Sequence, residues 1–211
     1  MRRRWILLAV AGLAGVGAVA WSAMANNVET PDYVVSSKQG DLEIRDYGPN
    51  IVAEATVEGE RDKAIQRGFS IIADYIFGNN LSSAKVAMTA PVLQQSSEKI
   101  AMTAPVTQQA QGQSWNVRFV MPSKYTIETL PKPVNPQVAL IEVPAKRLAV
   151  IRFSGSANRG SLDEQEGRLR TFLAERGLEA INTPQYAFYD APWTLPFMRR
   201  NEIMIEIADK E

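Results

Sequence analysis

The chain has 211 residues, with 23 basic and 23 acidic side chains and neither histidine nor cysteine. This length is sufficient for one domain with its own hydrophobic core. Without histidine the chain cannot form a Ser-His-Asp or Cys-His catalytic site or a histidine zinc site, and without cysteine it has no disulfide, thiolate nucleophile or cysteine metal site.

The first 25 residues have the pattern of an export signal. Three arginines at 2–4 precede an apolar run at 5–21, and Ala23-Met24-Ala25 offers a small-residue cleavage site. An uncleaved membrane anchor is the alternative, because this run reaches the lower end of the ~17–25 residues that span a bilayer. We therefore predict that residues 1–25 are a signal peptide or N-terminal membrane anchor. Residues 26–211 then form a single exported domain, either periplasmic or tethered to the outer face of the inner membrane.

The charge of the exported part disfavours nucleic acid as a partner. Removing residues 1–25 leaves 20 basic side chains (23 minus 3) against 23 acidic ones, a net charge of −3. Nucleic-acid affinity rests largely on basic contacts to phosphate, and the Lys and Arg residues form no basic stripe. We expect no nucleic-acid binding, and membrane contact only through residues 1–25 if they are not cleaved.

The first half of the domain predicts two strands followed by a helix. Residues 42–47 alternate apolar and polar side chains, and residues 51–57 follow a Gly-Pro-Asn turn, which together indicate a hairpin. Residues 60–76 have apolar side chains at spacings of three and four, as on one face of a helix, and Gly78 is suited to cap its end. The apolar positions of this face are Ile65, Phe69, Ile72 and Ile76.

A duplicated segment follows this helix. KVAMTAPVLQQ at 85–95 and KIAMTAPVTQQ at 99–109 are identical at nine of eleven positions. Apolar and polar side chains alternate in both copies, which predicts two strands joined by a turn, with methionines in the core. Alternatively, Met88 or Met102 is a thioether ligand or the wall of an apolar pocket. Either copy could occupy one and the same strand of the sheet.

The second half repeats the pattern of the first. A loop rich in Gln, Ser and Gly is expected at 108–114, and Ser161 with Glu164 forms a capping box for a second helix that ends at Gly177. Further strands are expected at 115–121, 138–143, 147–153, 185–190 and 201–208. The order strand-strand-helix-strand-strand thus occurs twice. It predicts one α+β domain with pseudo-twofold symmetry, in which a distorted antiparallel β-barrel or curved sheet carries two packed helices.

Six characteristic segments occur along the chain. KIAMTAPV lies at 99–106, and the others are LEIRDY at 42–47, ADYIFGN at 73–79, FVMP at 119–122, RFSG at 152–155 and PWTLPFMRRNE at 192–202. Together they resemble the SOUL heme-binding protein family, and KIAMTAPV is similar to its central signature. The resemblance covers roughly residues 31–207, and it implies that the copy at 85–95 is a local duplication.

The resemblance implies that heme or another tetrapyrrole binds in a shallow apolar groove between the first helix and the loop at 191–200. The implied groove residues are Lys63, Arg67, Ile71, Trp193, Leu195, Phe197, Met198, Arg199 and Arg200. The aromatic residues would stack on the porphyrin and the arginines would bind its propionates. The alternative is that Trp193 closes the barrel and the arginines pair with Glu202 or Glu206. Positions that are basic in some family members are Gln66, Asp74 and Leu195 in this chain, which departs from the family pattern.

Without histidine, heme iron would need another axial ligand. The candidates are Tyr75, Tyr189 and Met198, and binding without a ligand is the alternative. The sequence shows no nucleophile with a partner base, no phosphate-binding loop and no dinucleotide motif, so we expect no enzyme activity. The predicted function is tetrapyrrole binding for transport, buffering or sequestration. The alternative is a protein-interaction or structural module that receives a peptide partner in the same groove.

Overall fold

The computed structural model describes residues 28–82, 97–191 and 193–208. Its elements are β1 (Tyr33–Gln39), β2 (Leu42–Tyr47), β3 (Asn50–Glu58), α2 (Arg61–Ile76), β4 (Asn80–Leu81), β5 (Val106–Gln111), β6 (Ser114–Val120), β7 (Lys132–Pro133), β8 (Ala139–Val143), β9 (Lys146–Phe153), α3 (Arg159–Glu175), β10 (Gln185–Phe188), η1 (Pro196–Met198) and β11 (Asn201–Glu206). Residues 1–25 and the first copy of the repeat lie outside the described residues. Among the described residues, no helix is both long and apolar enough to cross a membrane.

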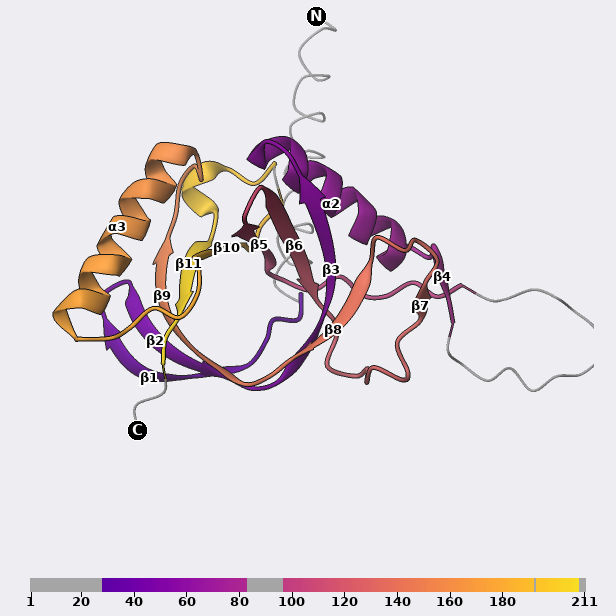
Figure 1. Ribbon diagram of the computed structural model, residues 1–211, viewed down its shortest axis with the longest axis horizontal. Helices are drawn as coiled ribbons and strands as arrows, with labels where there is room; N and C mark the ends of the chain where they lie inside the picture. Colours follow the sequence, from indigo (N-terminus) through magenta and orange to yellow (C-terminus); the bar gives the residue numbers. More distant parts are fainter. Residues whose placement is uncertain (1–27, 83–96, 192, 209–211) are drawn as a thin grey trace, which may run out of the picture.

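The core of the fold is a curled nine-stranded sheet in the order β1-β2-β9-β11-β10-β5-β6-β3-β8. Every pair of neighbours in it is antiparallel. Exchanging β2 with β8, β3 with β9, β5 with β10 and β6 with β11 maps the order from β2 to β8 onto itself. The predicted α+β class, the double repeat and the two packed helices are therefore confirmed, with β1 as an additional edge strand (Figure 1).

The predicted hairpin of residues 42–47 and 51–57 is wrong. The two segments are strands, but β2 pairs with β1 and β9, whereas β3 pairs with β6 and β8. Both edges of β2 are occupied, so the chain crosses after Tyr47 to the other half of the sheet. Each half thus contributes one strand to its partner, as the symmetric strand order requires.

The second copy of the repeat is a strand only at its end. Residues 97–105 have no ladder partner except an isolated bridge between Thr103 and Glu29, and β5 begins at Val106. The expected loop at 108–114 is instead a hairpin of β5 and β6, which turns at Gly112 with a φ of 59°. Positive φ is costly for residues other than glycine, and Gly112 allows this tight turn.

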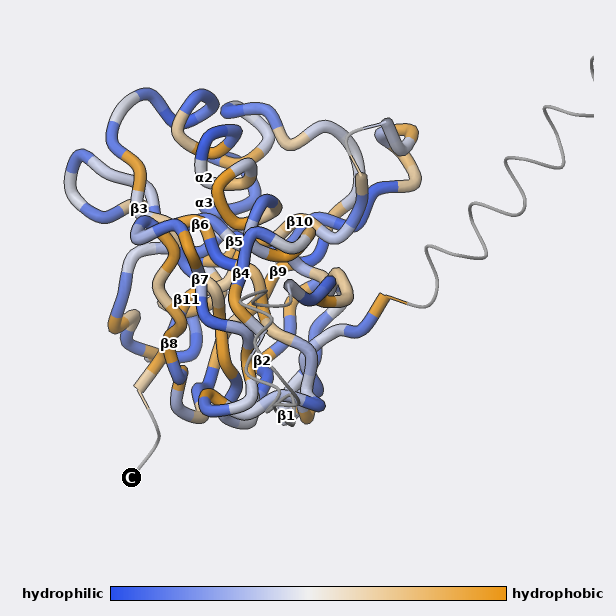
Figure 2. The backbone as a smooth tube through the Cα atoms, turned by 90° about the vertical axis from the view of Figure 1, so that its right-hand side faces the viewer, coloured by the Kyte–Doolittle hydropathy of each residue, from blue (hydrophilic) through white to orange (hydrophobic). Residues whose placement is uncertain are grey.

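Each helix covers one half of the outer face of the sheet. α2 packs on β3 and β6, and α3 packs on β9 and β11. The apolar residues at alternate positions of these strands form two clusters under the helices, and Figure 2 shows hydrophobic positions concentrated in the strands. α3 begins earlier than its predicted capping box, because the side chain of Asn158 accepts a hydrogen bond from Ser161 N at 3.0 Å. Asn158 is therefore the N-cap.

Candidate functional site

The loop between β10 and β11 presents large apolar side chains to solvent. Trp193, Leu195, Phe197 and Met198 are 55% to 72% exposed. The loop backbone is nevertheless held in place, since Gly155 N donates to Pro196 O at 2.9 Å and Met198 N donates to Leu195 O at 2.9 Å. The alternative role of Trp193 in closing the barrel does not fit its exposure. We call these four side chains the apolar loop patch.

The two arginines that follow this patch are engaged within the domain. Arg200 Nη2 lies 2.8 Å from Glu202 Oε1, and its guanidinium lies 3.8 Å from the centre of the Tyr189 ring. Arg199 Nε donates to Thr194 O at 2.7 Å and so helps to shape the loop. The alternative expected for Arg200, pairing with Glu202, is the one that the structure shows.

The groove residues expected on α2 differ in their exposure. Lys63 and Arg67 are exposed, and so is Gln66, whereas Ile71 is buried in the cluster between α2 and the sheet. Three cavities open among the described residues, and none of these three is lined by α2 or by the apolar loop patch. A groove that joins α2 to the loop therefore stays a prediction.

The candidate iron ligands lie in different environments. Tyr75 is buried, and its hydroxyl donates to Pro131 O at 2.8 Å, while the Tyr189 hydroxyl donates to Glu202 Oε2 at 2.8 Å. Burial raises the pKa of both phenols, which disfavours the deprotonated form that binds iron. Met198 is exposed and belongs to the apolar loop patch, so of the three it is the most accessible to an external ligand.

The inner face of the sheet carries a buried ionic network that the sequence analysis did not predict. Arg45 and Glu202 are 1% and 0% exposed, and their side chains form two hydrogen bonds of 2.8 and 3.1 Å. Arg45 Nε also donates to Glu43 Oε2 at 2.8 Å, and Arg118 pairs with Glu54. Removing either partner of a buried pair such as Arg45 and Glu202 would destabilise the fold strongly, because the remaining charge would be left uncompensated.

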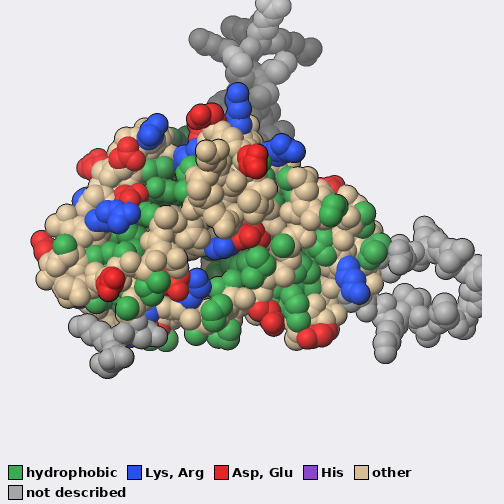
Figure 3. All heavy atoms as spheres, viewed as in Figure 1, with side chains coloured by type: hydrophobic (Ala, Val, Ile, Leu, Met, Phe, Trp, Pro, Cys, Tyr) green, Lys and Arg blue, Asp and Glu red, His purple; other side chains and the backbone are tan. Residues whose placement is uncertain are grey.

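Residues from both halves of the sheet meet around this inner face. A cavity of about 80 Å³ is lined by residues of β2, β3, β5, β6, β8, β9, β10 and β11, among them Tyr47, Val52, Leu148 and Met204. Their convergence on one cavity shows that the face opposite the helices is the concave one. In Figure 3 the surface is hollowed near the centre, with acidic, basic and hydrophobic side chains around the opening.

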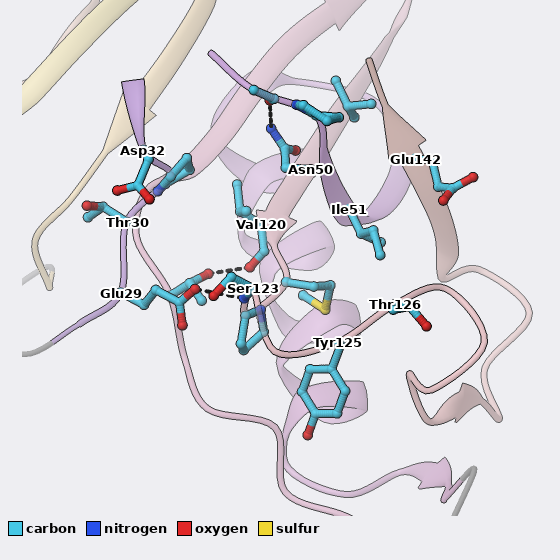
Figure 4. A pocket seen from close by; sticks show the side chains of 17 residues that line it. Glu29, Thr30, Asp32, Asn50, Ile51, Val120, Ser123, Tyr125, Thr126 and Glu142 are labelled. Carbon is cyan, nitrogen blue, oxygen red and sulfur yellow. Dashed lines mark hydrogen bonds between the residues drawn. The ribbon is translucent and has the colours of Figure 1, made fainter. Parts of the chain in front are cut away.

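A larger open cavity of about 670 Å³ lies where β3 begins and β6 and β8 end (Figure 4). Its acidic residues are Glu29, Asp32 and Glu142, and no Lys or Arg lines it. Glu29 is already engaged, because its Oε1 accepts from Ser123 N at 2.7 Å. The described residues contain no cluster of three or more His, Cys, Asp or Glu side chains suited to a metal ion.

Comparisons with known proteins match the sequence of this chain to one family. A family profile described as SOUL heme-binding protein matches residues 28–206. Heme-binding protein 2 of Homo sapiens is 29% identical over 189 residues, which are 87% of this chain and 88% of that protein. Heme-binding protein 2 of Mus musculus is 29% identical over 178 residues, covering 81% of this chain and 80% of its own length.

Solved structures with the same fold are more distant in sequence. The C-terminal domain of EcmrR superimposes with a TM-score of 0.56 at 12% identity, covering 80% of this chain and 98% of that domain. A hydrolase from Listeria innocua superimposes with a TM-score of 0.55 at 12% identity, covering 82% of this chain and 94% of that protein. At such identities the likeness concerns the fold alone.

Proposed function

This chain belongs to the SOUL heme-binding protein family, and on that premise we propose that it binds heme or another tetrapyrrole. Its two curated relatives carry the name Heme-binding protein 2 and align along most of this chain. We propose a binding role without catalysis, in a domain exported by residues 1–25. Export is supported by the basic start, the apolar run and the cleavage pattern of that segment.

The observation that carries the proposal is the apolar loop patch. A porphyrin needs flat apolar contact on its faces and cations near its propionates. Trp193 and Phe197 offer aromatic contact, and Met198 offers a thioether to the iron. Because Arg200 is committed to Glu202, we propose that exposed Lys63 and Arg67 of α2 provide charge for the propionates. The tetrapyrrole would then lie between the loop and α2.

The test is a titration of residues 26–211 with ferric heme, followed by the Soret band. Aromatic contacts of this type contribute about 0.5–1.5 kcal/mol, so Trp193→Ala and Phe197→Ala should each raise Kd by about 2- to 13-fold. Phe77→Ala is the matched control, since Phe77 is a 58% exposed phenylalanine outside the loop. We expect that control to bind as the unmodified protein does.

Two results would contradict this proposal in different ways. Saturable binding that neither loop variant changes would place the tetrapyrrole elsewhere in the domain. Binding that never saturates would remove heme as the ligand, and it would favour the alternative in which the apolar loop patch receives a peptide. That alternative is then tested by whether Phe197→Ala, but not Phe77→Ala, weakens association with the peptide partner.

A further inference from the structure

The second copy of the repeat, residues 99–109, occupies a well-defined site in the domain. We call it the repeat site, and it is formed by the residues that contact this copy: Glu29, Arg61, Ile76, Arg118, Val120 and Thr183. At the start of the copy, Ile100 N donates to Ile76 O at 2.9 Å, and the Ile100 side chain is buried under α2. Farther along, the Thr103 hydroxyl donates to Val120 O, and Ala104 N donates to Glu29 O at 2.9 Å. The copy ends in β5, the strand between β10 and β6.

Two glutamines anchor the end of the second copy in the repeat site. Gln108 Oε1 accepts from Arg61 Nη2 at 3.0 Å. Gln109 Nε2 donates to Thr183 O at 2.9 Å, and Gln109 Oε1 accepts from Arg118 Nη1 at 3.2 Å. These polar contacts fix the register of β5, because a shift by one residue would turn both side chains to the opposite faces of the sheet.

The first copy of the repeat has the residues that these contacts need. Fourteen positions earlier in the chain, the residues equivalent to Thr103, Ala104, Pro105, Gln108 and Gln109 are Thr89, Ala90, Pro91, Gln94 and Gln95. The two copies differ at two of these eleven positions. Val86 replaces the buried Ile100, which is a conservative change in volume. Leu93 replaces Thr107, which lines the inner cavity of the sheet, so the cavity offers space for the larger side chain.

The chain can also reach the repeat site from the first copy. The Asn80 side chain donates to Glu98 O and accepts from Glu98 N, at 2.8 and 3.0 Å. Both contacts use only backbone atoms at position 98, so Ala84, fourteen residues earlier, can provide them equally. The return from Asn80 to Ala84 has the length of a common tight connection.

We propose that the repeat site accepts either copy, so that β5 exchanges between two registers fourteen residues apart. With the second copy bound, the fourteen residues added by the duplication precede β5 in the chain. With the first copy bound, fourteen additional residues separate β5 from β6, and Leu93 enters the inner cavity. The second copy is favoured because Ile100 fills more of the core than Val86, and because Glu98 accepts a hydrogen bond from the Tyr125 hydroxyl, which Ala84 cannot.

The test introduces an aspartate into each copy of the repeat, within the full-length chain. If only the second copy can occupy the repeat site, Ile100→Asp puts a carboxylate into the core and abolishes cooperative unfolding in urea. If the first copy takes its place, the variant keeps cooperative unfolding with a lower urea midpoint. Val86→Asp alone should leave the midpoint unchanged, and the Val86→Asp/Ile100→Asp double variant should lose the folded state.

Each alternative outcome overturns the proposal. An unfolded Ile100→Asp variant would show that the first copy cannot take over, and a folded double variant would show that the site tolerates aspartate. A folded Ile100→Asp variant that elutes as a dimer would show exchange between chains instead. Deletion of residues 85–98 joins Ala84 directly to Lys99, so this variant must fold if the short connection is possible, and its failure to fold would also refute the exchange.

Discussion

The contact between α2 and the sheet predicts an unusual response to Gly68→Ala. A Cβ atom at position 68 would lie 2.6 Å from Val117 Cγ2 and 2.9 Å from Val117 Cβ. Carbon atoms pack best at about 3.5–4.0 Å, so α2 would have to move or Val117 would have to leave its rotamer. Such overpacking costs about 1–3 kcal/mol, against a gain of about 1 kcal/mol in helix propensity. We expect a net loss of up to about 2 kcal/mol in the free energy of unfolding.

Gly167→Ala in α3 is the matched control for this prediction. No atom lies within 4 Å of a Cβ at position 167, so only the propensity gain of up to about 1 kcal/mol applies. Urea unfolding followed by circular dichroism at 222 nm compares the two variants. Val117→Ala should relieve the Gly68→Ala defect, which makes the double variant more stable than the sum of the single effects. A Gly68→Ala protein as stable as Gly167→Ala would refute the argument.

Three further substitutions each test a single contact or buried group of the domain. Glu202→Gln should lower the free energy of unfolding, measured in urea, by about 3 kcal/mol. This is the lower end of the range for breaking a buried pair, because Arg45 retains Glu43 as a second acidic partner. Asn158→Ala should lower the free energy of unfolding by about 1 kcal/mol through loss of the N-cap, whereas Ser161→Ala should be nearly neutral, and thermal unfolding compares the two. If Ser161→Ala were the more destabilising of the two, the capping box at Ser161 would be the correct interpretation. Burial raises the pKa of Tyr186 to about 12, above its ordinary 10, so its contribution to stability is complete below pH 10 and is lost as the pH rises toward 12. Tyr186→Phe should flatten the fall in urea midpoint between pH 10 and 12.

The sequence predicted elements better than their pairing. Alternation located β2 within its observed bounds, because a strand buried on one face has a period of two. The same alternation contains no information about which strand lies beside it. The short Gly-Pro-Asn turn indicated a local hairpin, and the structure instead pairs β2 with β9, more than a hundred residues later in the chain. Long-range pairing of this kind depends on the packing of the whole domain.

The buried face of α2 illustrates a second limit. Apolar spacing placed Phe69 on the inner face, but Phe69 is half-exposed, and Ala64 and Gly68 lie against the sheet. Small residues allow close approach of a helix but contribute little to a hydrophobic pattern. For this reason the pattern located the helix correctly, but the side of the helix that it predicted to face the sheet is rotated by part of a turn from the observed one.

The ionic network inside the curl shows why the candidate site was only partly predictable. Alternation correctly puts Glu43 and Arg45 on one face of β2, and polar strand faces normally contact solvent. The curl of the sheet encloses this face, so both side chains are buried and pair with Glu202 from the far end of the chain. The apolar loop patch was predictable in contrast, because a Trp and a Phe in a proline-containing loop have no strand or helix to pack them.

The internal symmetry of the sheet separates its scaffold from its candidate functional parts. β5 and β6 are equivalent to β10 and β11, yet residues 112–113 join the first pair and residues 189–200 join the second. Likewise, residues 77–105 lie between α2 and β5, whereas residues 176–184 connect α3 to β10. The two extensions differ in their relation to the core. The longer connection between α2 and β5 contributes Ile100 to the cluster under α2, so substitutions in the repeat affect register and stability together. The loop between β10 and β11 exposes its large apolar side chains, so substitutions in the apolar loop patch should alter binding while the core remains intact.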